Sequence, residues 1–402
     1  MTANCPARLY EVGDLPGLEF DPVLAELLRD EPVARIRLPY GEGDAWLMTR
    51  YADVKFVASD PRFSRAATLG RPVTKMTRHH IPLERAVSYS DPPEHARVRR
   101  VVAKAFTDAS AEKLRPHAEQ VVNELVDAMT GAGRAGELVR QVTSPFPVRV
   151  IGELLGVPAV DWPRMTEWAQ TVLSVAHDQA AADRANRAKQ ESGEYFRALA
   201  AQRRARPEDD LVSKLVAAQA DGVLDEEELV GLSLLLQFNG WHAVRNNGSN
   251  MIYLLLTRPQ LWARLRGEPG LVPRAVEELL RFIPHKNGIG MPRVATEDVE
   301  VGGVLVREGE VVYVSYVAAN RDPEVYPDPD RIDLEREEVP HLAFGHGPHY
   351  CMGPALARME LEVLVGTLLT RLPDLRLAIP AAQVRWHTNA LIRGPIDLPV
   401  TW

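Results

Sequence analysis

The sequence predicts a mainly α-helical protein with a small β portion. From about residue 92 to 280, apolar residues recur at spacings of three and four, which is typical of helices with one buried face. The same spacing returns at 354–370. Alternating apolar residues beside turn glycines instead predict strands within about 34–60, 293–317 and 383–401. Together these observations favour a large helical body that carries a few short strands.

The first elements are expected close to the N-terminus. Residues 34–38 and 45–49 are short apolar runs that predict strands, and 51–59 predicts a helix. Within the helical body, the clearest segments are 111–129 and 225–258. The second begins with an aspartate followed three residues later by a glutamate, the pattern of an N-terminal capping box. At about 1.5 Å per residue, its ~34 residues would span about 50 Å, enough to cross the molecule.

The C-terminal part changes its pattern twice. Valine-rich runs of period two, separated by glycines, predict hairpins over 293–317. The stretch 319–353 is rich in Pro, Asp, Gly and His and predicts a long ordered loop, after which the helix 354–370 follows. The tail, 383–401, predicts another hairpin. Since no linker-like stretch interrupts the chain, we expect one domain over residues 1–402.

The composition excludes several classes of protein. Of the 402 residues, 46% are hydrophobic and 25% are charged, as in ordinary globular proteins. The net charge of −8 argues against nucleic acid as a partner, because phosphate binding needs clustered Lys and Arg. No apolar run reaches the ~18 residues of a membrane span, and no signal-peptide pattern is present. We therefore expect a cytoplasmic protein that contacts no membrane.

The two cysteines, Cys5 and Cys351, are too few for a disulfide framework or a Cys-rich zinc site. Cys351 lies in the string Phe344-Gly-His-Gly-Pro-His-Tyr-Cys-Met-Gly353, directly before the predicted helix. The glycines permit turns with positive φ, and the unpaired N–H groups of a helix start favour a thiolate. A lone cysteine is most often a buried thiol, but this setting also suits an axial ligand of a flat cofactor.

This string resembles the haem-binding loop of the cytochrome P450 family, Phe-Gly-x-Gly-x-His/Arg-x-Cys-x-Gly. Its fixed positions are matched by Phe344, Gly345, Gly347, His349, Cys351 and Gly353. The resemblance implies haem b with Cys351 as the axial ligand of its iron. It also implies a triangular-prism fold, with haem between the long distal helix and the proximal helix that follows the cysteine. Residues 49–64, 91–100 and 393–400 also resemble soluble bacterial members, so the resemblance covers nearly the whole chain.

Further family motifs occur in the right order. Glu278 and Arg281 match the family's Glu-x-x-Arg, and Arg336 matches the arginine that completes a buried structural cluster with them. Alone, a Glu-x-x-Arg pair is most often a solvated surface pair.

Four cations match positions that bind the haem propionates in the family. His95 and Arg99 match its His-x-x-x-Arg, whose spacing puts both side chains on one helical face, while Arg293 and His349 match two further positions. Arg suits carboxylates because its guanidinium can donate two parallel hydrogen bonds.

The centre of the distal helix departs from the family. The pattern Ala/Gly-Gly-x-Asp/Glu-Thr falls on residues 239–243, where Gly240 is kept, His242 replaces the acid and Ala243 replaces the alcohol. In the family, the acid and alcohol help deliver protons to oxygen. We hypothesise that protons come here from polar groups of the substrate or from ordered water, with His242 as one route, since imidazole titrates near neutral pH.

Asn239, His242, Asn246 and Asn250 share one face of this helix. That face fits either a polar wall of the substrate pocket or a stripe that packs against other helices. By resemblance, the pocket also draws on the segment near 284–290 and on the terminal turn. The candidate pocket residues are Phe238, Asn239, His242, Ala243, Asn246, Ile289 and Leu391.

The resemblance thus implies a monooxygenase-type oxidoreductase that uses dioxygen to oxidise a small apolar or aromatic compound of bacterial secondary metabolism, such as antibiotic biosynthesis. Because the chain has no flavin or iron–sulfur module, electrons from NAD(P)H are expected through ferredoxin reductase and ferredoxin. One alternative is oxidative C–C or C–N coupling, for example of phenols or aromatic cyclic dipeptides. Others are a haem-binding protein without turnover and, without haem, a helical interaction protein.

Overall fold

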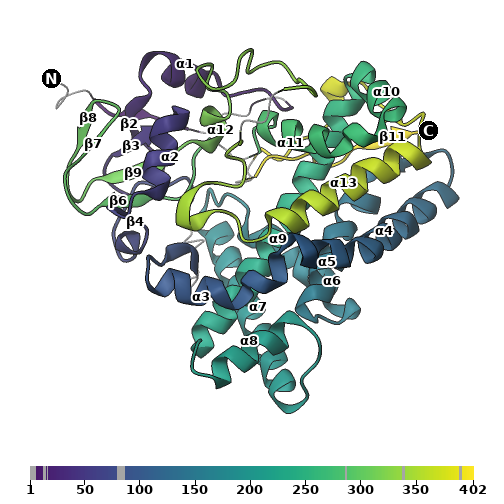
Figure 1. The fold of residues 1–402 in the computed structure, drawn as a ribbon, viewed down its shortest axis with the longest axis horizontal. Coiled ribbons are helices and arrows are strands. Elements are labelled where there is room, and N and C mark those ends of the chain that lie inside the picture. The colour runs from purple at the N-terminus through teal and green to yellow at the C-terminus, as the bar shows by residue number, and fades with distance from the viewer. Residues whose placement is uncertain are drawn as a thin grey trace.

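The computed structural model is wedge-shaped and tapers towards one helical corner (Figure 1). It describes residues 6–11, 15, 17–78, 87–285, 288–336, 340–388 and 392–402. Cys5 and Leu391, both named above, lie outside the described residues. Across the described part of the chain, no helix is long and apolar enough to span a membrane.

Helices form most of the body, as the apolar spacing predicts. Their bounds are α1 Pro22–Asp30, α2 Tyr51–Ser59, α3 Glu94–Ala103, α4 Asp108–Gly131, α5 Pro145–Leu155, α6 Trp162–Val172, α7 Gln179–Ala205, α8 Leu211–Ala220, α9 Glu226–Leu256, α10 Pro259–Gly267, α11 Val272–Phe282, α12 Tyr316–Ala319 and α13 Pro354–Arg371.

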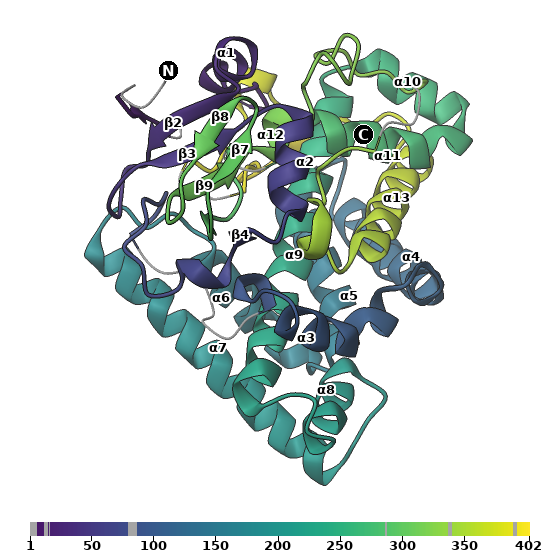
Figure 2. The ribbon, with the colours of Figure 1, turned by 60° about the vertical axis from the view of Figure 1, so that its left-hand side comes forward.

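The long helix α9 is the centre of the body. Its predicted capping box is confirmed, since the Asp225 side chain accepts from the Glu228 backbone N–H and Glu228 accepts in return. Most of its residues are buried on every side, and it packs against α5, α6, α7, α8, α10 and α13. Figure 2 shows it passing behind α2 and α3, between the strand-rich side and the remaining helices.

The strands gather mainly on one side of α9, beside α1 and α2 (Figure 1). Within the described residues, a six-stranded sheet has the order β1-β2-β3-β9-β6-β4, and smaller sheets have the orders β10-β11-β5 and β7-β8. The bounds are β1 Arg8–Leu9, β2 Val33–Arg37, β3 Ala45–Met48, β4 Phe63–Ser64, β5 Ala135–Glu137, β6 Arg293–Ala295, β7 Val299–Val301, β8 Val304–Val306, β9 Val311–Val314, β10 Arg376–Leu377 and β11 Pro399–Thr401.

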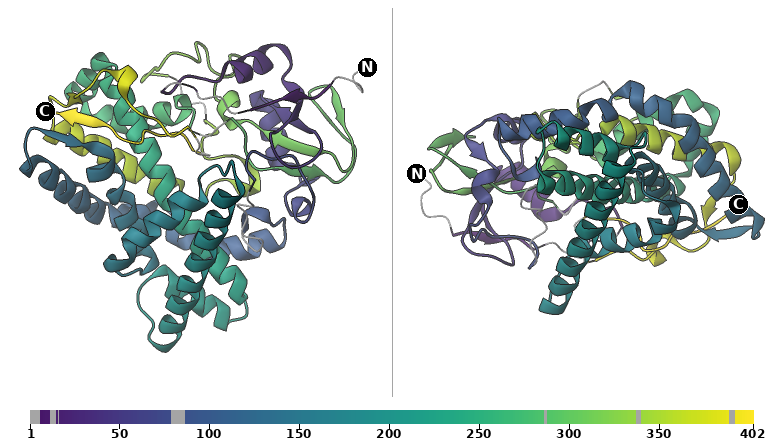
Figure 3. Two further views of the ribbon diagram at one scale, coloured as in Figure 1. Left: turned by 180° about the vertical axis from the view of Figure 1, so that it is seen from behind. Right: turned by 90° about the horizontal axis from the view of Figure 1, so that it is seen from below.

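The tail pairs with itself as a short hairpin, as predicted, and its last strand pairs elsewhere. Trp386 and Pro395 form an antiparallel bridge, flanked by hydrogen bonds from the His387 N–H to the Gly394 carbonyl and from the Ile396 N–H to the Arg385 carbonyl. Strand β11 pairs with β5 and β10. The C-terminus therefore closes against a strand formed far earlier in the chain. Figure 3 shows it from behind, at the edge opposite the N-terminus.

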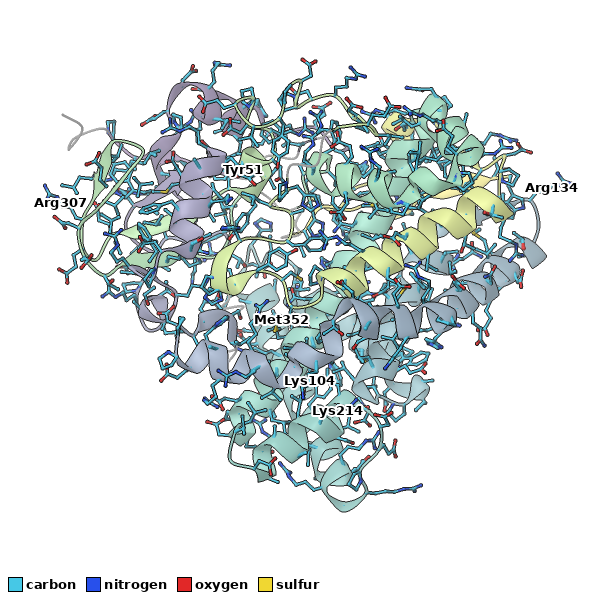
Figure 4. All side chains as sticks on the ribbon, in the orientation of Figure 1. Tyr51, Lys104, Arg134, Lys214, Arg307 and Met352 are labelled. Carbon is cyan, nitrogen blue, oxygen red and sulfur yellow. The ribbon has the colours of Figure 1, made fainter. Side chains whose placement is uncertain are left out.

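The loop before α13 is held by a close backbone approach. Gly347 has φ +71°, and a Cβ at this position would lie 2.4 Å from the Ala58 carbonyl oxygen at the end of α2. Only glycine therefore fits here without displacing the loop. The Cys351 N–H donates to the Phe344 carbonyl at 2.9 Å and closes the turn. Met352, the next residue, lies near the centre of the molecule at the start of α13 (Figure 4).

A buried charge cluster fixes the long segment that leads to this loop. Glu278 and Arg281 on α11 form two hydrogen bonds of 2.7 and 2.8 Å, and the Arg336 Nε lies 3.2 Å from the same carboxylate. Arg281 also donates to the carbonyls of Asn320 and Pro329. The three residues quoted for the family's Glu-x-x-Arg cluster thus meet in one place and tie the 320–336 segment to α11.

Replacing Glu278 by glutamine should destabilise the fold strongly, because two arginines would lose their carboxylate in a buried site. We expect the free energy of unfolding to fall by about 3 kcal/mol or more, measured by urea denaturation. Glu335→Gln is the matched control, since this exposed glutamate pairs with Arg264 at the surface. The control should lower the free energy of unfolding by less than about 1 kcal/mol. Equal effects of the two substitutions would contradict this assignment.

Candidate active site

Three arginines and two histidines gather around the Cys351 loop. His95 and Arg99 come from α3, Arg293 opens β6, and His349 lies in the loop itself. These are the four cations that the sequence analysis selects, and the fold brings them together. The fifth is Arg65, which directly follows β4 and which the sequence analysis does not select.

These five side chains contact mainly uncharged groups. The His95 and His349 rings are 4.3 Å apart between centroids. Arg99 donates to the carbonyls of Pro348 and Cys351, both at 3.2 Å, and so grips the loop on either side of His349. The buried Arg293 lies 3.5 Å from the Tyr316 hydroxyl.

The electrostatics of the cluster show an excess of positive charge. Burial, together with Arg65 and the other cations, lowers the pKa of His349 to about 2. Burial and Arg99 lower the pKa of His95 to about 4. Within the described part of the chain, none of the five side chains forms an ion pair with a carboxylate. Buried positive charge without a counter-charge is costly, so the cluster calls for an anionic ligand.

The residues present fit haem. Its two propionates would supply the carboxylates that the cluster lacks, and Cys351 would supply an axial sulfur ligand from the adjacent loop. Cys351 is half-buried and three residues before Pro354, the first residue of α13, where backbone N–H groups and the positive charge of Arg99 both favour a thiolate. Phe344, Gly345 and Gly353 shape the same loop.

A second clamp outside the predicted motifs holds the loop against α11. Arg358 on α13 donates to both oxygens of Glu277, at 2.7 and 2.9 Å, and its guanidinium lies 4.6 Å from the centre of the Phe344 ring. His341 lies 3.2 Å from the same carboxylate. Glu277 is only the neighbour of a motif residue, so a single sequence carries no signal that would single it out.

The middle of α9 presents a neutral imidazole where the family has an acid. The Asn246 amide nitrogen lies 3.2 Å from His242 Nε2, and Arg245 donates to the Asn246 amide oxygen at 2.5 Å. Burial, with the charge of Arg245 and two nearby imidazoles, holds the pKa of His242 well below its usual range. His242 is therefore uncharged at neutral pH and can pass a proton only by accepting one at one ring nitrogen while releasing another.

The candidate pocket residues fall into three groups. Asn239 is exposed and donates to the Leu235 carbonyl at 2.9 Å, while Ala243 and Ile289 are half-buried. Phe238 lies in the main core, and Asn246 is fully buried. Leu391 is outside the described residues.

Gly240 and Asn250 show what the rest of this helix face contacts. A Cβ on Gly240 would lie 2.7 Å from the Ile151 side chain, so the glycine lets α9 approach α5 closely. Asn250 donates to the Arg393 carbonyl at 3.0 Å. The polar stripe therefore packs against protein at Asn246 and Asn250 and is open at Asn239.

Comparisons with known proteins agree over the whole length. Residues 148–373 match the family model of cytochrome P450. The chain is 49% identical over 399 residues to biflaviolin synthase CYP158A1 of Streptomyces coelicolor, covering 99% of this chain and 97% of that protein. It is 48% identical over 397 residues to nocardicin C N-oxygenase of Nocardia uniformis subsp. tsuyamanensis, covering 98% of both.

A solved structure extends the similarity to the fold. Cytochrome P450mel 107F1, described as having biaryl coupling reactivity, matches with a TM-score of 0.95 at 45% identity, over 99% of this chain and 100% of that one. The chain therefore belongs to the cytochrome P450 family, and the predicted fold class is confirmed. Membership makes it a haem-iron oxidoreductase of the monooxygenase type that draws electrons from a redox partner.

The Glu277 clamp should make stability depend on pH. Burial alone would raise the pKa of Glu277, but His341 and Arg358 outweigh burial and lower it from 4.5 to about 2. Its contribution is therefore complete above about pH 4.5 and is lost as the pH falls towards 2. Glu277→Gln should unfold with a shallower pH dependence across this window and should lose about 1 kcal/mol of stability at pH 7. Chemical denaturation at several pH values measures both, and parallel curves for the two proteins would refute the clamp.

Proposed function

We propose that this chain oxidises an aromatic natural product and that its main reaction is oxidative coupling of two aryl groups. The observation that carries the proposal is the centre of α9, where His242 and Ala243 stand in place of the acid and the alcohol. Ala243 has no hydroxyl to relay a proton, and His242 is buried and uncharged. Coupling and oxygen insertion each need two protons from outside, so a site without the acid and the alcohol favours an aromatic substrate whose own acidic groups, such as phenol hydroxyls, can deliver protons.

Haem b, when bound, supplies the activation of dioxygen, and we assign its axial ligand to Cys351. His95, Arg99, Arg293 and His349 would hold its propionates, and the Glu277 and Glu278 clusters would fix the loop that carries the cysteine. Asn239, Ala243 and Ile289 are the described candidates that remain open to a substrate. Phe238 is then a core residue rather than a contact residue.

The proposed coupling balances with the expected electron supply. Two aryl C–H bonds break and one aryl–aryl bond forms, which removes two electrons and two protons from the substrates. Dioxygen takes these together with two electrons and two protons from outside and becomes two molecules of water. The outside electrons would come from NAD(P)H through ferredoxin reductase and ferredoxin, acting as separate proteins.

The names of similar proteins support aryl coupling and also point to a second candidate reaction. One relative is named for making biflaviolin, and the neighbouring structure is described as having biaryl coupling reactivity. Another relative is named as an N-oxygenase, so insertion of one oxygen atom is the second candidate. In that case protons would arrive through ordered water, with His242 as one route.

The mass of the product distinguishes the two candidates. Phenols and aromatic cyclic dipeptides that shift the Soret band on titration would be turned over with ferredoxin, its reductase and NADPH. We expect a product equal to two substrates minus two hydrogen atoms. A product one oxygen atom heavier than the substrate would replace coupling by oxygenation, and no product with steady haem reduction would favour a protein without turnover.

A substitution of His242 tests its part in moving protons. His242→Ala should slow turnover by about tenfold or more if the imidazole relays protons, with unchanged haem content. The matched control is His117→Ala, since His117 lies on α4 and pairs with Glu153 away from the site. Turnover and coupling efficiency equal to those of the control would remove the relay function and leave His242 as a packing residue.

A further inference from the structure

Arg65 carries a buried charge that no acidic side chain among the described residues neutralises. The residue is 7% exposed, and its Nε has no hydrogen-bond partner within the described part of the chain. Its Nη1 donates to the Ser88 carbonyl at 3.2 Å and lies 3.7 Å from the Met291 sulfur. These two contacts engage Nη1 with uncharged groups, but they do not neutralise the positive charge of the guanidinium. An isolated charge in a buried site is costly.

The sheet forces this charge towards a second one. Strands β4 and β6 are antiparallel, with Phe63 opposite Ala295 and Ser64 opposite Val294. Arg65 follows directly, where the chain turns out of the strand with φ −86° and ψ −36°, and the next residue of β6 beyond this pair is Arg293, which is 1% exposed. Two like charges that are buried near each other repel more strongly than they would in water. Burial and the charge of Arg293 accordingly lower the pKa of Arg65 to about 9, which still leaves it charged at neutral pH.

The carboxylate of Asp91, which lies beside this segment, is already engaged elsewhere. Asp91 accepts hydrogen bonds from the backbone N–H groups of Arg65 and Ala66 and from the Ser64 hydroxyl. It therefore anchors the backbone of this segment and does not pair with the guanidinium. The Asp91 contacts hold the backbone of Arg65 in place but do not reach its guanidinium. The guanidinium charge instead acts on His95 and His349, whose pKa values Arg65 helps to lower.

We propose that Arg65 binds a haem propionate together with Arg293, as a fifth cation of the cluster. The proposal rests on the haem site of the proposed function and adds a residue that none of the family motifs in this sequence marks. A carboxylate between the two arginines would remove their repulsion, satisfy the open Nε and use the forked geometry that guanidinium groups offer to carboxylates. A purely structural arginine would gain nothing from a position near another buried arginine.

The test measures how firmly the loaded protein retains haem. Arg65→Gln and Arg65→Lys would be compared with the wild type for the rate of haem transfer to excess apomyoglobin. We expect transfer to be about ten- to a hundred-fold faster in Arg65→Gln, since a charge-assisted hydrogen bond is lost, and intermediate in Arg65→Lys. The control is Arg62→Gln, whose arginine is three residues away and pairs with Asp60 near the surface. It should transfer haem at the wild-type rate.

A second experiment tests whether Arg65 acts through the charge of the propionate. Wild type, Arg65→Lys and Arg65→Gln would be reconstituted with the dimethyl ester of haem, which has no carboxylates. The differences in transfer rate among them should then disappear. Differences that persist with the ester would mean that Arg65 only supports the fold, which overturns the proposal. The lysine variant keeps a charge at this position, so the comparison holds even where the glutamine variant folds poorly.

Two further outcomes would overturn the assignment of Arg65 to a propionate. Arg65 variants that retain haem like Arg62→Gln, but lose affinity for 4-(imidazol-1-yl)benzoate and not for 1-phenylimidazole, would make Arg65 a ligand of acidic substrates and overturn the propionate assignment. A wild-type chain that takes up no haem at all would overturn the proposed function and this inference with it.

Discussion

Positive charge buried beside the Cys351 loop, which no carboxylate of the described residues neutralises, is the constraint on which the site depends. Arg65, His95 and Arg293 are nearly or fully buried, and Arg99 and His349 are half-buried beside them. A protein interior tolerates such a cluster only when an anion completes it. Binding of the anionic cofactor should therefore also stabilise this region of the fold. The same requirement explains why α3, β4, β6 and the loop meet at one point.

The rest of the fold holds the cysteine loop against that point. Gly347 lets the loop reach the end of α2, Arg99 grips two of its carbonyls, and the Glu277–Arg358 pair ties it to α11. The Glu278 cluster fixes the long segment before it. Apart from the Glu278–Arg281 pair within α11, the hydrogen bonds among these contacts join residues from 58 to 252 positions apart. The position of Cys351 is therefore set by the tertiary structure, and only its turn is set locally.

Much of this arrangement could be predicted from the sequence, for identifiable reasons. The capping box at Asp225 is a local pattern and is confirmed. The family motifs marked Cys351 and four of the five cations because their spacing is distinctive. Arg65 was missed because an arginine after a short strand looks like a surface residue until the β4–β6 register places it near Arg293. The tail pairs with itself near Trp386 and Pro395 as predicted, but the pairing of β11 with β5 was not predicted, since alternation predicts a strand and does not name its partner.

All these contacts hold Cys351 where its thiolate would bind haem iron. The absorption spectrum of the purified, reduced protein under carbon monoxide tests this ligation. We expect a Soret band at about 450 nm, because a thiolate donates electron density to the iron, and we expect Cys351→Ala to lose it. A band at the wavelength of a histidine-ligated haem, or a band at about 450 nm that survives the substitution, would contradict it.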